Sequence, residues 1–278
     1  PPAKWNELFR AHMAQVPQLP RALEPPAPAL RLPSPWRQWG IFLKRDVLAK
    51  LGNTSYLAVN LLEAPLLALI LAFLLRFGGT AADGQAHAYV LAANTNLPVY
   101  LFTSILVGLF MGLTVSAEEI HLDRKIRKRE AFLHLSRQSY LLSKVALLFG
   151  LAAAQTLVYV LIGNSIMGIE GLAWDYWAML FTVTCFANLL GLNISSAFDS
   201  AVTIYILIPL LLIPQIVLSG AMVRFDELNP RVSHPDRVPL AGDLMASRWA
   251  YEGLAVRQFA ANRYERHFYE ADGALAAL

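Results

Sequence analysis

Long apolar blocks dominate the pattern of hydrophobic and polar positions along this chain. Each block contains about twenty residues, the length that an α-helix needs to cross a hydrocarbon layer roughly 30 Å thick. The blocks are too long for barrel strands and do not alternate between polar and apolar residues, so we expect helices. The predicted spans are residues 56–77, 97–117, 140–162, 176–197 and 201–223.

The segment before the first span has a different pattern. Trp36, Trp39, Leu43 and Val47 recur at helical spacing, and basic residues flank them. Tryptophan favours the depth of the lipid headgroups, and cations favour the phosphates. The pattern predicts an amphipathic helix at the membrane surface, with an ordinary surface helix of a soluble domain as the alternative.

Composition supports a membrane protein. Of the 278 residues, 56% are hydrophobic and 15% are charged, whereas soluble domains contain roughly a quarter charged residues. The single cysteine, Cys185, lies within an apolar block, which excludes an intrachain disulfide. The net charge of +3 comes from basic residues beside the apolar blocks, where they suit lipid headgroups, so we expect no nucleic-acid partner.

The two ends of the chain differ from its middle. Residues 1–35 are rich in proline and alanine and are predicted to form a linker, because proline blocks helix propagation. The chain begins with Pro-Pro-Ala and no initiator methionine, so we expect a fragment of a longer protein. Residues 36–223 form the predicted transmembrane domain, and residues 224–278 are expected to form an external segment, on the side of the membrane opposite the cytoplasm, before a last span.

Lysine and arginine predict the orientation. They are frequent before the first span and in the 118–139 loop, and they are absent from residues 78–96 and 163–175. Loops rich in lysine and arginine stay in the cytoplasm. We therefore expect a multi-pass protein with a cytoplasmic amino terminus, a cytoplasmic 118–139 loop and external loops at the two other positions.

Catalytic motifs are absent from the sequence. It contains no G-x-x-x-x-G-K-[ST] motif for nucleotide phosphates and no H-E-x-x-H zinc motif. Ser219 is followed by glycine at the end of the fifth span, but no histidine or lysine within a span is placed to activate it. We expect no catalytic residue, no metal site and no cofactor on this chain.

Polar residues inside the spans are candidates for function, because an ionisable group in lipid is costly. Glu63 has two interpretations: a carboxylate on a substrate or coupling-ion path, or a structural carboxylate paired with Lys144 or a cation of the amphipathic helix. Asn188 belongs to a row of polar residues in the fourth span, which either join helices by hydrogen bonds or line a path. Pro209 and Pro214 predict a kink in the fifth span.

The 118–139 loop contains many charges of both signs. The run from Glu118 to Glu130 predicts a solvated helix on the cytoplasmic face. One interpretation is an anchor that sets topology, and the other is a helix that docks onto another protein by charge complementarity.

Three motifs, in order, resemble the membrane domains of ABC exporters of the ABC-2 type, ABCG (White) subfamily. They are Arg129-Glu130 followed by Ser139-Tyr140-Leu-Leu-Ser-Lys144, then Leu218-Ser-Gly-Ala-Met-Val223, then Arg248-Trp-Ala-Tyr-Glu-Gly-Leu254. The preceding amphipathic helix is similar to the connecting helix of that subfamily. The resemblance covers about residues 36–260.

The resemblance implies an ATP-driven exporter that works as a dimer around a central path. ATP and Mg would bind a nucleotide-binding domain upstream or on a partner subunit, and a sixth span would follow residue 278. An apolar gate falls on Ile206 and Leu207. The position of a stacking phenylalanine in the subfamily falls on Met111, which argues against a flat aromatic substrate. Contacts with the nucleotide-binding domain would come from Glu118, Asp123, Arg124, Lys125, Arg127, Lys128, Arg129 and Glu130.

The predicted fold is therefore an all-α polytopic bundle of about five transmembrane helices. The predicted function is the permease part of an ABC-2 exporter in a bacterial inner membrane, since the external segment lacks the cysteines of animal members. A non-transporting membrane anchor or assembly protein and an ion-coupled transporter that uses Glu63 are the alternatives. The substrate is not predicted.

Overall fold

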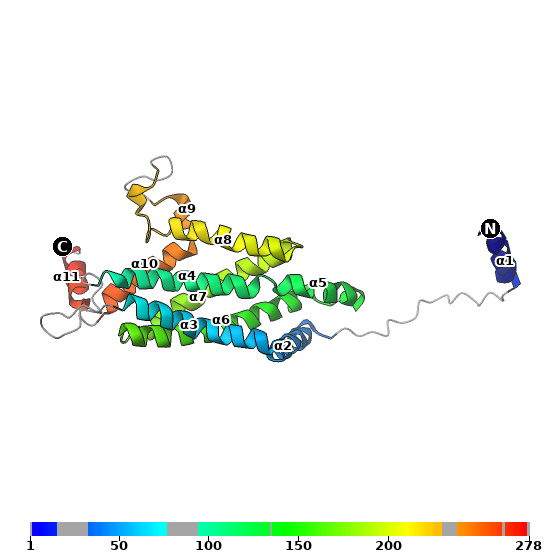
Figure 1. Cartoon of the computed structure of the whole chain (residues 1–278), viewed down its shortest axis with the longest axis horizontal. Coiled ribbons are helices and arrows are strands. Elements are labelled where there is room, and N and C mark those ends of the chain that lie inside the picture. Colours follow the sequence, from blue (N-terminus) through cyan, green and yellow to red (C-terminus); the bar gives the residue numbers. More distant parts are fainter. Residues whose placement is uncertain are drawn as a thin grey trace. The chain divides into compact units, whose positions relative to one another are not determined.

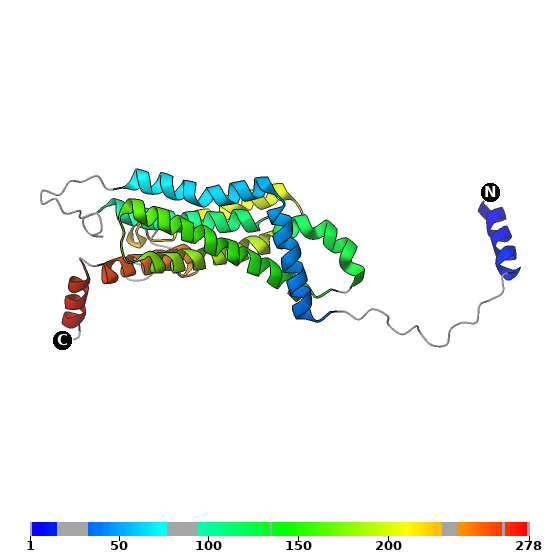
Figure 2. The ribbon, with the colours of Figure 1, turned by 90° about the horizontal axis from the view of Figure 1, so that it is seen from below.

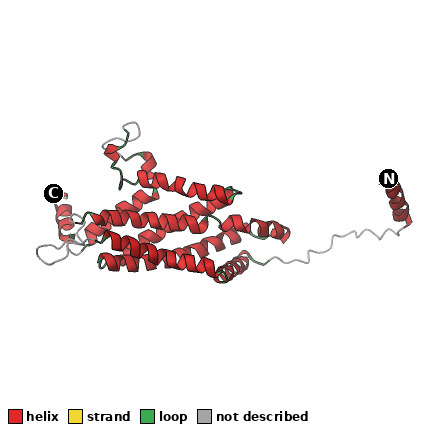
Figure 3. Cartoon of the chain, in the orientation of Figure 1, coloured by secondary structure: helices red, strands yellow, loops and turns green. Residues whose placement is uncertain are grey.

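The computed structural model describes residues 2–15, 33–76, 94–133, 135–229, 238–262 and 265–276, and all regular elements in these ranges are helical (Figure 3). The chain divides into two compact units, residues 1–34 and 35–278. The first unit contains α1 (Pro2–Gln15), where we predicted only a linker. Its one proline stands at the start of the helix, where the missing N–H costs nothing. The later prolines at positions 17–28 lie outside the described residues.

The second unit is a bundle of apolar helices (Figure 1). By length and composition, four stretches of the described residues can cross a membrane. This confirms the predicted class of fold. The stretches are α3 (Thr54–Leu75), the run Asn96–Leu133 that contains α4 (Asn96–Ser116), α6 (Arg137–Met167) and α7 (Ala173–Ala197).

The fifth predicted span is shorter than expected. Helix α8 covers only Ala201–Val217, 17 residues, which extend roughly 26 Å. The chain turns at Gly220, whose φ is +74°, a conformation that favours glycine. A Cβ atom there would lie 2.8 Å from the ring of Phe225. The turn therefore ends the apolar segment before the predicted boundary at residue 223.

Helices α4 and α7 pack closely through glycines. A Cβ atom at Gly112 of α4 would lie 2.6 Å from the carbonyl oxygen of Thr184 on α7, and one at Gly108 would lie 3.0 Å from the Thr184 hydroxyl. Gly191 of α7 faces Ser116 in the same way. Small residues four positions apart allow helix backbones to approach in a membrane. This pairing forms the centre of the bundle.

The two ends of the bundle carry different elements. Helices α2 (Pro35–Leu51) and α5 (Glu119–Glu130) lie at one end, and α10 (Ala246–Ala261) and α11 (Arg266–Ala276) lie at the other (Figures 1 and 2). We call the first end the α5 end. The short elements are α9 (Leu240–Asp243) and two 3-10 turns, Ala131–Leu133 and Phe225–Glu227.

Candidate functional site

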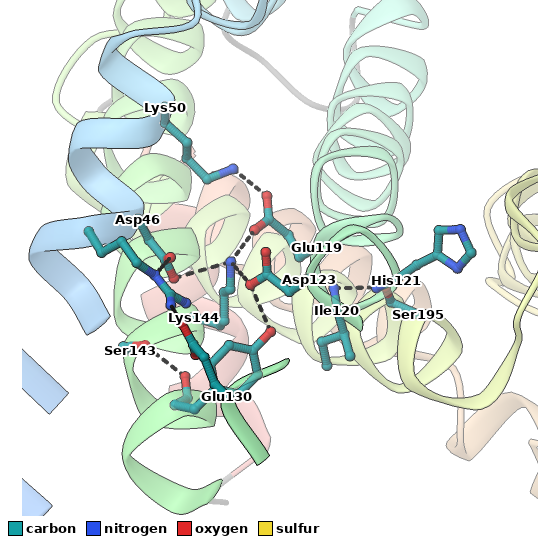
Figure 4. Close-up of polar contacts among 12 residues, drawn as sticks. Asp46, Lys50, Glu119, Ile120, His121, Asp123, Glu130, Ser143, Lys144 and Ser195 are labelled. Atoms are coloured by element: carbon teal, nitrogen blue, oxygen red, sulfur yellow. Dashed lines mark hydrogen bonds and ion pairs between the residues drawn. The ribbon is translucent and has the colours of Figure 1, made fainter. Parts of the chain in front are cut away.

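A buried lysine at the α5 end joins three helices. Lys144 of α6 is 4% exposed. Its Nζ lies 3.1 Å from Oδ2 of Asp46 on α2, 3.2 Å from Oε2 of Glu119 and 2.8 Å from Oδ2 of Asp123, both on α5 (Figure 4). One cation therefore holds three carboxylates from two other helices.

Helical spacing brings these side chains together. On α2, Gln38, Phe42 and Asp46 are buried at intervals of four residues, which places them on one face of the helix. On α6, Tyr140 and Lys144 follow the same interval. On each of these two helices, one charged residue lies on a buried face whose other members are uncharged.

Further polar contacts surround Lys144. Lys50 pairs with Glu119 and donates a hydrogen bond to the hydroxyl of Tyr56 at 2.9 Å. The Tyr140 hydroxyl donates to Oδ2 of Asp123 at 2.9 Å. Glu119 therefore has two cations, and Asp123 has a cation and a hydroxyl donor, so both carboxylates are partnered where they are largely buried.

An outer ion pair closes the cluster. The Arg45 guanidinium lies 3.2 Å from Glu130 at the end of α5, and both side chains are about one-third exposed. The same guanidinium contacts Asp46 at 3.5 Å. We call the residues Arg45, Asp46, Lys50, Glu119, Asp123, Glu130 and Lys144 the charge cluster; it contains three cations and four carboxylates.

The other side of α5 is tied to the end of α7. The Ser195 hydroxyl accepts hydrogen bonds from the backbone N–H groups of Ile120 and His121, both at 3.0 Å. Both N–H groups belong to the first turn of α5, where backbone donors have no acceptor within the helix. In return, Arg124 donates to the carbonyl oxygens of Ser195 and Ser196, the latter at 2.8 Å, and pairs with Asp199.

The arrangement makes α5 a rigid attachment. Separating one partner from a buried ion pair leaves an uncompensated charge and costs about 3–5 kcal/mol. A displacement of α5 would break buried ion pairs with α2 and α6 together with hydrogen bonds to the end of α7. The lower-energy response is for these helices to move with α5.

The outward face of α5 has a different character. Leu122 is 65% exposed and Ile126 is 44% exposed. Lys125 and Arg129 are exposed as well, and neither of them forms an ion pair with a described residue. This face combines apolar and basic side chains and is open to a partner.

The predicted coupling residues divide between these two faces. Asp123 and Glu130 belong to the charge cluster, and Arg124 holds the end of α7. The Arg127 guanidinium lies 4.8 Å from the centre of the Tyr140 ring. Glu118 precedes α5 and is half-buried. Of the remaining three, Lys125 and Arg129 are exposed on the outward face, and Lys128 lines the hollow between α5, α2 and the start of α6.

The other predicted site residues lie elsewhere in the bundle. Met111 is 1% exposed and belongs to the core, and Asn188 is 2% exposed, with its amide 3.5 Å from the Leu148 carbonyl oxygen. On α8, Ile206 is 64% exposed and Leu207 is half-buried. Their roles in a path or gate stay predictions.

Glu63 does not have the predicted structural partner. It is half-buried on α3 and forms no ion pair with a described residue. Lys144 and Lys50, which we expected to reach it, instead bind carboxylates of the charge cluster. Three-way pairing with buried carboxylates satisfies Lys144 better than one contact with Glu63, so the predicted pairing is wrong.

Five residues of the charge cluster were missed as site residues: Arg45, Asp46, Lys50, Glu119 and Lys144. Lys144 begins the third apolar block, where a charge requires a partner, so its sequence position alone marked it. Asp46 and Lys50 stand four residues apart on one helix face. Among the described residues, no group of three or more His, Cys, Asp or Glu side chains is arranged to hold a metal ion.

Comparison with known proteins agrees with these features. The family model described as "ABC-2 type transporter" matches residues 37–234, which run from α2 through α8. No curated protein matches the chain. Domains of this family are membrane-embedded permease components, and they generally work with nucleotide-binding ATPases. Because the match covers more than half of the chain, this protein belongs to the ABC-2 type transporter family.

Proposed function

We propose that this chain forms the transmembrane pathway of an ATP-driven exporter and that α5 receives the motion of a nucleotide-binding domain. The exporter would be a dimer in a bacterial inner membrane, similar to the ABCG subfamily, with ATP and Mg bound by the ATPase. The family match supports a permease. The three ordered motifs of the sequence support the subfamily.

The observation that carries the proposal is the two-sided character of α5. Its inward face is bonded to α2, α6 and α7 through Lys144 and Ser195. Its outward face exposes Leu122, Lys125 and Arg129. A helix with this arrangement can bind an acidic and apolar partner surface on one side and pass its displacement to several spans on the other.

The expected sidedness supports the same assignment. The segments rich in lysine and arginine, α2 and α5, lie together at one end of the bundle (Figure 2). That end would face the cytoplasm, where ATP is available. Ile206 is exposed on α8, as expected of a residue that closes a central path against a second copy of the chain.

Charge reversal on the outward face tests the proposal. The variant Lys125→Glu/Arg129→Glu should reduce ATP hydrolysis by the assembled transporter roughly tenfold or more, because like charges at an interface cost several kcal/mol. The control Arg37→Glu/Lys44→Glu makes the same charge change on exposed positions of α2 and should keep most of the activity. Hydrolysis is measured with the full protein and its ATPase in proteoliposomes. Unchanged hydrolysis in the α5 variant would show that the outward face is not the contact.

A further inference from the structure

A cavity of about 510 Å³ lies beside the charge cluster, between α2, α5 and the start of α6. Its walls come from the middle of α2, from α5, from the 3-10 turn after α5 and from the first residues of α6. The lining residues are Phe42, Arg124, Arg127, Lys128, Glu130, Ala131, Leu135, Ser136, Arg137 and Tyr140.

The cavity is strongly basic. Four of its lining residues are cations, and Glu130 is the one carboxylate among them. That carboxylate is already bound by Arg45. Lys128 and Arg137 form no ion pair with a described residue, and the Arg127 guanidinium rests on the ring of Tyr140. The cavity therefore offers cationic donors that lack a carboxylate partner.

One wall of the cavity is apolar. Phe42 and Tyr140 meet edge to face with ring centres 5.8 Å apart, and both line the cavity. Leu135 lies beside them. A small soluble anion needs no such surface, whereas a molecule with a charged head and an apolar body uses both walls.

The helices around the cavity have the pattern expected at the depth of the lipid headgroups. Arg137 begins α6, and the apolar span of that helix follows within one turn. Helix α2 exposes Trp36, 77%, and Ile41, 56%, as helices do that lie in the membrane interface. With the apolar part of α6 in the hydrocarbon layer, the cavity would open at the level of the headgroups.

We infer that this cavity binds the phosphate headgroup of an anionic phospholipid from the leaflet at the α5 end. Arginine and lysine side chains bind phosphate oxygens by charge-assisted hydrogen bonds, which for arginine can be bidentate. Basic pockets on the cytoplasmic side of membrane helices suit such headgroups. The glycerol and the first methylenes of the lipid would contact Phe42 and Leu135.

A bound lipid would act on the α5 attachment. Arg127 and Lys128 belong to α5, and Arg137 belongs to α6, so a single phosphate between them would bridge the two helices. The bridge would reinforce the contact that Lys144 makes a short distance away. The anionic lipid content of the membrane would thereby regulate how firmly α5 is coupled to the spans, a consequence that rests on the proposed function, whereas lipid binding itself does not.

Native mass spectrometry of the full protein tests lipid binding. Purified protein is titrated with phosphatidylglycerol and, separately, with phosphatidylcholine. Arg127→Gln/Lys128→Gln/Arg137→Gln should weaken phosphatidylglycerol binding at least about tenfold, since each cation near a membrane contributes to anionic lipid affinity. The control Lys44→Gln/Lys125→Gln/Arg129→Gln removes the same charge from exposed positions that do not line the cavity and should bind like the wild type.

The remaining outcomes overturn the inference. Equal affinity of the cavity variant and the control for phosphatidylglycerol would show that the lipid binds elsewhere. Full displacement of the lipid by millimolar inorganic phosphate would show a free-anion site rather than a headgroup site. Loss of ATPase co-purification in the cavity variant with unchanged lipid binding would show that the cavity accepts an acidic partner protein. Thermal unfolding, monitored by the reaction of Cys185 with a maleimide dye, verifies that both variants are folded.

Discussion

Replacing Lys144 by methionine should strongly destabilise the α5 end of the bundle. Methionine keeps most of the volume and removes the cation that Asp46, Glu119 and Asp123 share at 2.8–3.2 Å. Lys50 and Arg45 still bind Glu119 and Asp46, whereas Asp123 loses the cation that it contacts at 2.8 Å. Breaking one buried ion pair costs about 3–5 kcal/mol. A shift of 1 kcal/mol changes the Tm of a domain of this size by roughly 2–4 °C.

The expected decrease in Tm is therefore on the order of 10 °C. A maleimide dye that becomes fluorescent on reaction with Cys185 measures it, because this single cysteine is buried and reacts only on unfolding. The matched control is Lys125→Met on the exposed face of α5, which should change the Tm by no more than about 2 °C.

A double variant separates charge from packing. Adding Asp123→Asn to Lys144→Met removes the carboxylate that the first substitution leaves without a cation. The double variant should therefore recover part of the lost stability. Equal Tm values for Lys144→Met and Lys125→Met would refute the argument that the charge cluster holds α5. Failure of the double variant to recover any stability would indicate that Lys144 acts through packing alone.

Other positions give predictions of the same kind. Gly112→Ala should cost about 1–3 kcal/mol in unfolding free energy because its Cβ meets an α7 carbonyl, whereas Gly150→Ala in open space should stabilise α6 by up to about 1 kcal/mol; the same dye assay measures both. Ser195→Ala should cost about 1 kcal/mol through the lost α5 cap, and Ser196→Ala, whose hydroxyl bonds only within its own helix, should cost less. Glu63→Gln should leave ATP-driven transport and Tm unchanged, because no described cation pairs with it; loss of transport at normal ATPase activity would favour the ion-coupled alternative.

The membrane helices could be predicted because apolar length is a local property of the sequence. The starts of α3 and α8 lie within two residues of the predicted boundaries, and the amphipathic segment at residues 36–50 corresponds to α2. The end of α8 was misplaced because the apolar run continues through Leu218 to Val223, while the chain makes a left-handed turn at Gly220, where a side chain would collide with the ring of Phe225. Hydropathy does not report such a contact.

The charge cluster was harder to predict because its partners are far apart in sequence. Asp46 and Lys144 come from different helices, and only the packing of α2 on α6 shows that they meet. The sequence indicated that Lys144 needs a partner but did not identify it, and Glu63, the partner considered, is not among the carboxylates that Lys144 contacts. The close packing of Gly108 and Gly112 was readable as a small-residue motif, and our sequence analysis did not use it.

Resemblance identified the charged run after the second span without dividing its residues by role. Asp123 and Lys125 stand two positions apart, which on a helix turns them toward different faces. In the structure, Asp123 is bonded to Lys144, and Lys125 is exposed. Spacing within α5 shows that the two residues lie on different faces, but only the position of α6 shows which of these faces is buried.

Photo-cross-linking from the outward face of α5 tests the central claim most directly. Benzophenone-alanine in place of Lys125 is activated in native membranes that contain the full protein and its ATPase, and adducts are identified by peptide mass spectrometry. The same label in place of Leu62, which is 64% exposed on the apolar face of α3, is the control. The account predicts an adduct between position 125 and a peptide of the nucleotide-binding domain, with none from position 62. Absence of that adduct from position 125 in membranes with active ATPase would contradict the account.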